Sequence, residues 1–288
     1  MAPDSVEMQD IRGLDIDKAL KGFELTAYIF KGLVNNSSTN GDAIRWYQET
    51  AADLTTTSPS VNANVSPLST FPTLEVSWTR NTSYPRKYAN EGFISIEDIK
   101  SADIDVFART ILRLTRAVAK QVDTRIYNIL TETQTPVNIG SSNAVGGGWD
   151  AANTNPIADL LSGAQAIATN NYDTGGLVVA MNPKNYKDLM VYLTTTGGSN
   201  WTQYASEKVQ TGVVGSLLGM KLVVSNNVVA DSVSVSLPST AVTWKSLMPL
   251  SSKVIDDPGI GKKIRIWEQG EAILTDPKAS YLITETDL

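Results

Sequence analysis

The strongest pattern in the chain is an apolar repeat with a spacing of three or four residues, within residues 94–130. Its members are Ile104, Phe107, Ile111, Leu114, Val118, Val122, Ile126 and Ile129. This spacing places every member on one stripe of an α-helix. Ser101 before the repeat is a suitable N-cap, and Asp103 and Asp105 suit the positive end of the helix dipole. We therefore predict one long amphipathic helix after a short lead-in, ending near 131–136.

Four basic residues follow the apolar stripe in register, each two positions after one of its members. We name them the basic row: Arg109, Arg113, Arg116 and Lys120. Two residues correspond to about 200° of helix rotation, so the basic row lies opposite the apolar stripe. The row is a candidate binding surface. It has three interpretations: a contact with nucleic acid, ion pairs with a neighbouring subunit, or a solvated helix face.

Residues 43–54 and 72–90 are the predicted arms of an extended hairpin. The second arm is rich in Thr, Val, Trp and Tyr, which favour strands, and its apolar residues alternate with polar ones. Residues 55–71 between the arms contain two prolines and no charged residue. Such a long loop is unusual inside a compact domain. An uncharged tip with scattered apolar residues suits docking on a neighbouring subunit; the alternative is a plain surface loop.

The second half of the chain combines helices and strands. Two Asn-Pro pairs, at 155–156 and 182–183, join a cap residue to a proline suited to the first turn, so we predict a helix after each. A continuously apolar run predicts a buried strand at 175–181, and a second buried strand is predicted at 217–228, after a turn glycine. Strand patterns dominate the last third. The predicted fold class is α+β.

Composition removes several classes of enzyme. The chain has 288 residues, a formal net charge of −6, and neither Cys nor His. These absences exclude disulfides, thiolate and His-ligated metal sites, and Ser-His-Asp or Cys-His catalysis. The glycine-rich stretches lack the Gly-Lys-Ser/Thr of a phosphate-binding loop. We expect no enzyme activity, no cofactor and no metal site, although carboxylate and lysine chemistry survive this reasoning.

Targeting signals are not found in the sequence. No stretch approaches the roughly 20 apolar residues of a membrane span, and the acidic N-terminus lacks the order of a signal peptide. We therefore expect a soluble protein that is made in the cytoplasm. The acidic balance argues against a dedicated nucleic-acid reader, which carries a basic excess, but it allows one local basic surface.

Three ordered segments carry a family resemblance. The first is the predicted helix with its lead-in, which starts Ser-x-Glu-Asp at 95–98 and has Asp123 late in the helix. The second is GGLVVAMNPKNYKDLM, residues 175–190, and the third is LLGMKLVVSNNV, residues 217–228. In this order they resemble the spine helix and two axial-domain motifs of the tailed-bacteriophage major capsid protein, the Hong Kong ninety-seven type fold. The resemblance covers roughly residues 42–288.

The resemblance implies a phage capsid fold in four parts. They are an N-terminal arm (1–41), an extended β-hairpin loop (42–92), a peripheral domain with the long spine helix (93–140 plus 260–275), and an axial α/β domain (141–259 plus 276–288).

The resemblance also implies a structural function. The expected protein is a major capsid protein that self-assembles into hexamers and pentamers of an icosahedral shell around double-stranded DNA, in the virion, after assembly in the host cytoplasm. Expected partners are copies of itself, a portal, DNA and a separate scaffolding protein, with a decoration protein as a further option and no membrane. A separate scaffold is expected because the extended loop begins by about residue 42. No covalent loop crosslink is expected because the 55–71 tip contains no Lys.

Two other functions stay open at this point. An encapsulin-type nanocompartment shell shares the fold but encloses a cargo enzyme. A soluble carboxylate-dependent enzyme on an α+β scaffold would be a monomer or a small oligomer with a concave acidic pocket.

Overall fold

The computed structural model describes residues 28–49, 66–70, 78–96, 104–131, 138–141, 148–151, 154–195 and 215–286. Most of the predicted N-terminal arm, most of the loop tip and the cap at Ser101 lie outside these residues. The chain divides into two compact units. Unit 1 takes its described residues from Met1–Ile44, Tyr84–Tyr127 and Trp244–Ile273, and unit 2 takes its own from Arg45–Ser83, Asn128–Thr243 and Leu274–Leu288.

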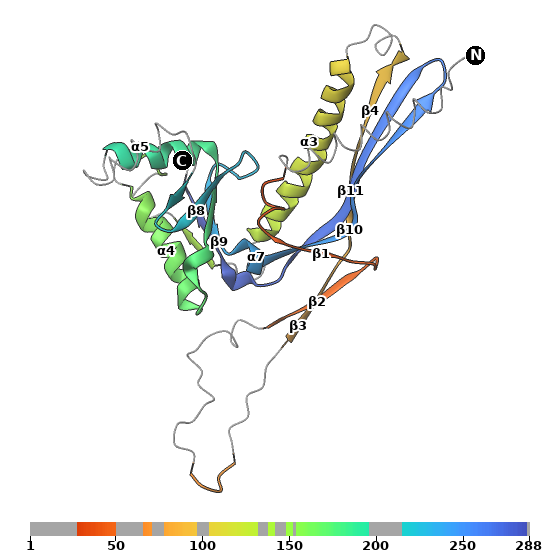
Figure 1. Ribbon diagram of the computed structural model, residues 1–288. Coiled ribbons are helices and arrows are strands. Elements are labelled where there is room, and N and C mark those ends of the chain that lie inside the picture. Colours follow the sequence, from red (N-terminus) through yellow and green to blue (C-terminus); the bar gives the residue numbers. More distant parts are fainter. Residues whose placement is uncertain are drawn as a thin grey trace. The chain divides into compact units, whose positions relative to one another are not determined.

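Unit 1 consists of one long helix, α3 (Ile104–Leu130), lying along a four-stranded sheet (Figure 1). The strand order is β1-β10-β11-β4. The strands are β1 (Asn35–Ser38), β10 (Val242–Asp257), β11 (Gly261–Leu274) and β4 (Arg86–Ser95). β4 and β11 are antiparallel, and Ile264 lies opposite Gly92.

The apolar stripe of α3 faces this sheet, as its spacing predicts. The stripe residues whose side chains are described are all buried: Ile111, Leu114, Val118, Val122, Ile126 and Ile129. Ile264 and Ile266 of β11 pack against the N-terminal half of this stripe. Helix and strand approach closely at Gly92, where a Cβ atom would lie 2.9 Å from the Cδ1 atom of Leu114. A larger residue at this position would push the helix away from the sheet.

One strand boundary in unit 1 differs from the predicted one. The second arm of the hairpin was expected to run through 72–90, but the chain leaves its first partner at Tyr84-Pro85 and residues 86–95 pair with β11 instead. β10 extends to Asp257 and turns into β11 at Gly259, whose φ of +80° favours glycine. Residues 244–259 therefore belong to unit 1. The expected division of the chain into four parts stays a prediction.

Unit 2 is built on a six-stranded sheet of order β5-β12-β9-β6-β8-β7. The strands are β5 (Asn138–Ser141), β12 (Ser280–Thr284), β9 (Ser232–Ser236), β6 (Val178–Met181), β8 (Met220–Val224) and β7 (Ser216–Leu217). β6 is parallel to β8 and antiparallel to β9. The sheet is therefore mixed, as α+β domains allow.

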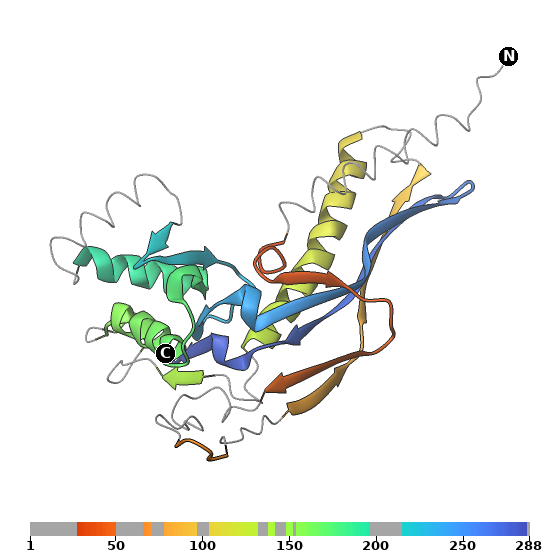
Figure 2. The same cartoon turned by 60° about the horizontal axis from the view of Figure 1, so that its bottom comes forward.

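Helices α4 (Pro156–Thr169) and α5 (Pro183–Thr195) pack with this sheet in one apolar core (Figure 2). Short helical turns lie at η1 (Thr174–Gly176), α7 (Pro238–Ala241) and η2 (Pro277–Ala279). Both Asn-Pro signals are confirmed, because the side chains of Asn155 and Asn182 each accept a backbone hydrogen bond at the start of the helix. The apolar spacing in the sequence of α4 predicts one buried face made of Ile157, Leu160, Leu161, Ala164 and Ile167. This prediction is wrong for Leu161, whose side chain is 48% exposed.

The core of unit 2 is closely packed where α4 crosses β9 and β12. Gly163 lies against this sheet, and a Cβ atom there would be 3.0 Å from Val235 and 3.1 Å from Tyr281. Leu160 and Ile167, one turn to either side, are fully buried. A glycine in mid-helix weakens the helix by about 1 kcal/mol relative to alanine, and here it allows the close approach.

The predicted hairpin is present as β2 (Ile44–Glu49) and β3 (Trp78–Ser83). Among the described strands these two pair only with each other. Tyr47 on β2 is 61% exposed. The indole N–H of Trp46 donates to the carbonyl of Leu274 at 3.0 Å and so holds the base of the pair.

Candidate functional site

The basic row lies on the exposed side of α3. Its four side chains are all exposed, and the stripe residues between them are buried. At 100° per residue the row occupies an arc of about 60°, and at 1.5 Å per residue the eleven steps from Arg109 to Lys120 extend about 16 Å. The sequence therefore predicted the position of these residues correctly. Their role stays a prediction.

The charged side chains that are exposed on α3 between residues 108 and 130 are all basic. Between residues 108 and 130, where side chains of α3 are described, the exposed residues outside the basic row are Ala117, Gln121 and Asn128. The only acid in that stretch is Asp123, and it is buried. Successive row members are three or four residues apart, so each repels the next by roughly 0.2–0.5 kcal/mol.

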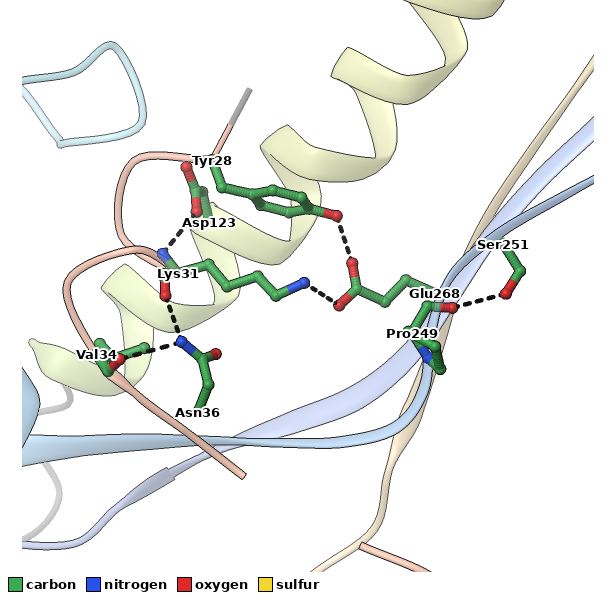
Figure 3. A network of polar contacts seen from close by, with 8 residues as sticks. All are labelled: Tyr28, Lys31, Val34, Asn36, Asp123, Pro249, Ser251 and Glu268. Carbon is green, nitrogen blue, oxygen red and sulfur yellow. Dashed lines mark hydrogen bonds and ion pairs between the residues drawn. The ribbon is translucent and has the colours of Figure 1, made fainter. Parts of the chain in front are cut away.

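On its buried side, α3 uses Asp123 to hold the segment 28–34 (Figure 3). The Oδ2 atom of Asp123 accepts a hydrogen bond from the backbone N–H of Ile29 at 2.7 Å, and Oδ1 accepts one from Lys31 at 3.1 Å. Phe30 between them packs on Tyr127, one turn further along α3, with ring centroids 5.4 Å apart. Successive backbone N–H groups that converge on one carboxylate form an anion-binding concavity.

Burial changes the acidity of Asp123. Removal of the carboxylate from water raises its pKa, and the backbone N–H groups of Ile29, Lys31 and Phe30 partly oppose the rise because they favour the charged form. The net direction is upward, so the folded chain holds the Asp123 proton more tightly than an unfolded chain does.

Glu268 on β11 holds the same segment from the side of the sheet. It is fully buried and accepts hydrogen bonds from the hydroxyl of Tyr28 and, at 2.7 Å, from the Nζ atom of Lys31 (Figure 3). The ammonium group of Lys31 also lies 4.3 Å from the centre of the Tyr28 ring, a cation–π contact. Segment 28–34 is therefore bound by an acid of the helix and an acid of the sheet.

Glu271, three residues further along β11, joins β11 to α3 and to the start of β4. Its Oε1 atom lies 2.6 Å from the Nη2 atom of Arg125, and its Oε2 atom lies 3.2 Å from the Nε atom of Arg86. Nearby Tyr88 has its pKa raised to about 12, first by burial and second by the charge of Glu271. Tyr88 therefore stays neutral at physiological pH.

We name these six charged residues the ionic cluster: Lys31, Arg86, Asp123, Arg125, Glu268 and Glu271. Three acids meet three bases, so the cluster is neutral when all six are ionised. It joins four elements, which are segment 28–34, β4, α3 and β11. Glu268 pairs with Lys31, and Glu271 pairs with Arg86 and Arg125. Asp123 accepts hydrogen bonds from backbone N–H groups of segment 28–34. The cluster provides structural support, and within the described residues no group of three or more acids is arranged to hold a metal ion.

Sequence reasoning recognised only Asp123 among these residues. A signal for Glu268 was available, because it lies two positions after Ile266 and four after Ile264 on one face of β11. In a strand, positions separated by two share a face, so this acid was placed on the buried side. An acid in a buried register needs a base, and Lys31 lies 237 residues away.

None of the helices in the described parts of the chain is both long and apolar enough to span a lipid bilayer.

Solved structures that are similar to this chain include a virus-like particle and a phage capsid. The virus-like particle from Pyrococcus furiosus is 12% identical, with a TM-score of 0.65 and coverage of 93% of this chain and 97% of that chain. The capsid of Cyanophage P-SCSP1u is 15% identical, with a TM-score of 0.65 and coverage of 90% and 88%. The structure of Mycobacterium phage Che8 is 16% identical, with a TM-score of 0.62 and coverage of 91% and 92%. The chain therefore has the fold of shell-forming structural proteins.

A family model described as phage capsid protein matches residues 81–282, well over half of the chain. The chain belongs to the phage capsid protein family. It is a structural protein of the viral capsid, with the α+β capsid fold that the ordered segments predicted. No curated protein matches the sequence significantly.

Proposed function

We propose that this chain is the repeating subunit of an icosahedral shell, in which hexamers and pentamers of identical copies enclose double-stranded DNA. Family membership supports the capsid role. The exposed pair β2–β3 is the observation that supports assembly from copies of this chain. We assign the extended-loop role to this pair, the peripheral role to unit 1 and the axial role to unit 2. The N-terminal arm role goes to residues 1–41.

The pair β2–β3 is an unusual structure for a chain that acts alone. A two-stranded sheet is at best marginally stable in water, because it buries too little apolar surface. The described side chains of this pair are mostly exposed, including the aromatic ring of Tyr47. In the loop beyond it, Leu68 is fully exposed and has a positive φ of 71°. A neighbouring copy that covers this surface would supply the missing burial.

The same proposal specifies partners and location. Self-association into closed rings requires the same surfaces on every copy, which symmetric shells satisfy. We propose that a portal and a separate scaffolding protein assist assembly in the host cytoplasm, with a decoration protein as a further option. The 55–71 segment contains no Lys, so we propose that the shell is held without a covalent loop crosslink. We propose no catalytic activity.

A nanocompartment shell is the second candidate. The TM-score to the Pyrococcus furiosus virus-like particle equals that to the Cyanophage P-SCSP1u capsid, 0.65 in each case. Fold similarity alone therefore does not separate a shell around cargo from a shell around a genome. The phage capsid family match favours the genome-enclosing shell.

The test is electron microscopy of the purified full-length chain, produced alone and together with a scaffolding protein from the same genome. We expect closed shells, or rings of five and six subunits that close when the scaffold is added. Deletion of residues 50–77, joined by a short Gly-Ser linker, should abolish shells while units 1 and 2 stay folded by circular dichroism. Monomers under every salt and scaffold condition would contradict the proposal, and a co-purified cargo enzyme would favour the nanocompartment.

A further inference from the structure

We propose that Asn40 is a site of spontaneous covalent modification, at which the side-chain amide is converted into an aspartyl or isoaspartyl group. The sequence contains a single Asn-Gly pair, Asn40-Gly41, and it lies in the connection between β1 and β2. Asparagine is a thermolabile residue, and it reacts most readily before glycine, whose lack of a Cβ atom leaves the next backbone nitrogen open to attack. The inference is independent of the proposed function, since it needs only the chemistry of this connection.

The Asn-Gly pair has no hairpin turn to support at this place. Asn-Gly commonly forms the two-residue turn of a β-hairpin, in which both residues have a positive φ. Here the flanking strands do not form a hairpin, because β1 pairs with β10 and β2 pairs with β3. Neither Asn40 nor Gly41 has a positive φ. A Cβ atom at Gly41 would lie 3.5 Å from the carbonyl oxygen of Ala43, so other residues fit this position as well.

The connection is exposed between two fixed ends. At the first end the backbone N–H of Thr39 donates to the carbonyl of Ser246 at 2.8 Å, and at the second end the side chain of Ile44 is buried. Residues 40–43 between these ends are all exposed and lie outside any strand. Water can therefore reach the reacting atoms, and the backbone nitrogen of Gly41 is not part of a sheet ladder.

Asn36 provides a contrast within the same stretch of chain. It is also exposed, but it lies in β1. Its Nδ2 atom donates to the carbonyl oxygens of Lys31 at 2.9 Å and Val34 at 3.2 Å, which holds the carboxamide against segment 28–34 (Figure 3). Exposure therefore does not distinguish the two asparagines, whereas the order of the surrounding chain does. We expect Asn40 to react and the fold to protect Asn36.

The reaction needs only solvent water as a co-reactant. The backbone nitrogen of Gly41 attacks Cγ of Asn40, the bond from Cγ to Nδ2 breaks, and ammonia leaves with the proton of the attacking nitrogen. The product is a cyclic imide, a succinimide. Water then breaks the bond from this nitrogen to Cγ, which gives an aspartyl residue, or the bond to the main-chain carbonyl carbon, which gives an isoaspartyl residue.

Each product changes the connection in a defined way. Both add one negative charge close to Asp42, in a chain whose formal net charge is already −6. The isoaspartyl form also lengthens the main chain by one atom, because the chain then runs through Cβ and Cγ. The modification therefore alters the link that leads from β1 into the β2–β3 pair as the protein ages.

The test follows the purified full-length chain during incubation in mildly alkaline buffer, which favours the deprotonated backbone nitrogen. Trypsin releases residues 32–45 as one peptide. It contains Asn35, Asn36 and Asn40, so tandem mass spectrometry compares their rates of deamidation directly. An isoaspartyl methyltransferase labels the isoaspartyl product. The synthetic peptide 32–45, incubated in the same buffer, gives the rates without the fold.

Two alanine variants separate the role of Gly41 from that of glycine in general. Gly41→Ala places a Cβ atom beside the attacking nitrogen without strain in the folded chain. The matched control is Gly32→Ala in the same peptide, where a Cβ atom would lie 3.6 Å from the carbonyl oxygen of Ile29. Circular dichroism verifies that both variants are folded.

We expect deamidation of the folded chain at Asn40, at a rate within a few-fold of that in the synthetic peptide. Asn36 should react many-fold more slowly than Asn40, and more slowly than it does in the peptide. Gly41→Ala should slow the reaction at Asn40 at least several-fold, whereas Gly32→Ala should leave it unchanged. A rate at Asn40 many-fold below that of the peptide would overturn the inference, because the fold would then protect the site. Equal rates for Gly41→Ala and the wild type would overturn it as well.

Discussion

The two compact units hold their helices onto their sheets by different means. In unit 2, α4 and α5 are fixed by apolar side chains and by the close approach at Gly163. In unit 1, the first half of the stripe of α3 packs on Ile264 and Ile266, but its second half is next to the ionic cluster. Apolar contacts have no preferred direction, whereas charge-assisted hydrogen bonds have defined distances and directions and so specify geometry as well as adding energy. The ionic cluster therefore defines one position for segment 28–34.

This comparison predicts that the two units respond differently to truncation and to charge removal. The largest effect belongs to Leu160→Ala in unit 2. Leu160 is fully buried, so the change loses transfer energy and leaves a cavity, at a cost of about 3 kcal/mol in the free energy of unfolding. Guanidinium denaturation of the unassembled subunit measures it. The control is Leu161→Ala on the same helix, where exposure should hold the cost below about 1 kcal/mol. Equal costs would show that α4 is not packed as described.

The next effect belongs to Glu271→Gln in unit 1. Loss of this carboxylate leaves Arg125 and Arg86 without their shared partner, and we expect a cost of about 2 kcal/mol. The cost is smaller than for a fully buried pair, because both arginines reach water. The control, Glu91→Gln, breaks an exposed pair with Arg265 on the same sheet and should cost below about 1 kcal/mol.

A double replacement sharpens this result. Changing both Glu271 and Arg125 to leucine removes both charges, so it should destabilise unit 1 less than Glu271→Leu alone. If the double variant were the worse of the two, packing rather than charge pairing would explain the role of these residues.

The smallest and most local effect belongs to Asp123→Asn. Asparagine keeps one acceptor but turns an NH₂ group toward the N–H groups of Ile29 and Lys31, so segment 28–34 should detach more often. Tryptic cleavage after Lys31 should become several-fold faster, while the global unfolding midpoint changes little. Unchanged cleavage at this site would contradict the anchoring role of Asp123.

The pH dependence of the stability difference between the wild type and Asp123→Asn has a defined sign. The pKa of Asp123 is raised in the folded chain, so the stability linked to its proton is fully present below the unfolded value of 3.8 and is lost as pH rises through the folded value. The asparagine side chain of the variant does not titrate. The stability advantage of the wild type over Asp123→Asn should therefore shrink as pH increases above 3.8. An advantage that grew with pH would mean that the hydrogen bonds to the carboxylate outweigh its burial.

The helical parts of the fold could be predicted from the sequence because their signals are local. The apolar stripe, the opposed basic row and the two Asn-Pro caps need only neighbouring residues to be recognised. The hairpin arms were also visible, but the boundary near Pro85 was missed. Proline cannot donate a ladder hydrogen bond, so Pro85 was an available signal for a break between two strands.

The missed features depend on residues far apart in the sequence. β10 contains Pro249, and a proline argues against a strand. On one side β10 pairs with β1, but β1 has only four residues and β10 has sixteen. Most of β10 therefore has no partner on that side among the described strands, so it can accept a proline. The burial of Glu268 becomes clear only when Lys31 and Tyr28 are placed beside it. Leu161 was misplaced because it borders the apolar face of α4 without being covered by the sheet.

The central claim is that copies of this chain close into a shell in which each covers the β2–β3 pair of another. Cryo-electron microscopy of the assembled particle tests it most directly. We predict that β2 and β3 lie on a neighbouring subunit and that the ring of Tyr47, 61% exposed in the single chain, is buried there. A particle in which Tyr47 stays in solvent, or in which the pair folds onto its own subunit, would contradict the account.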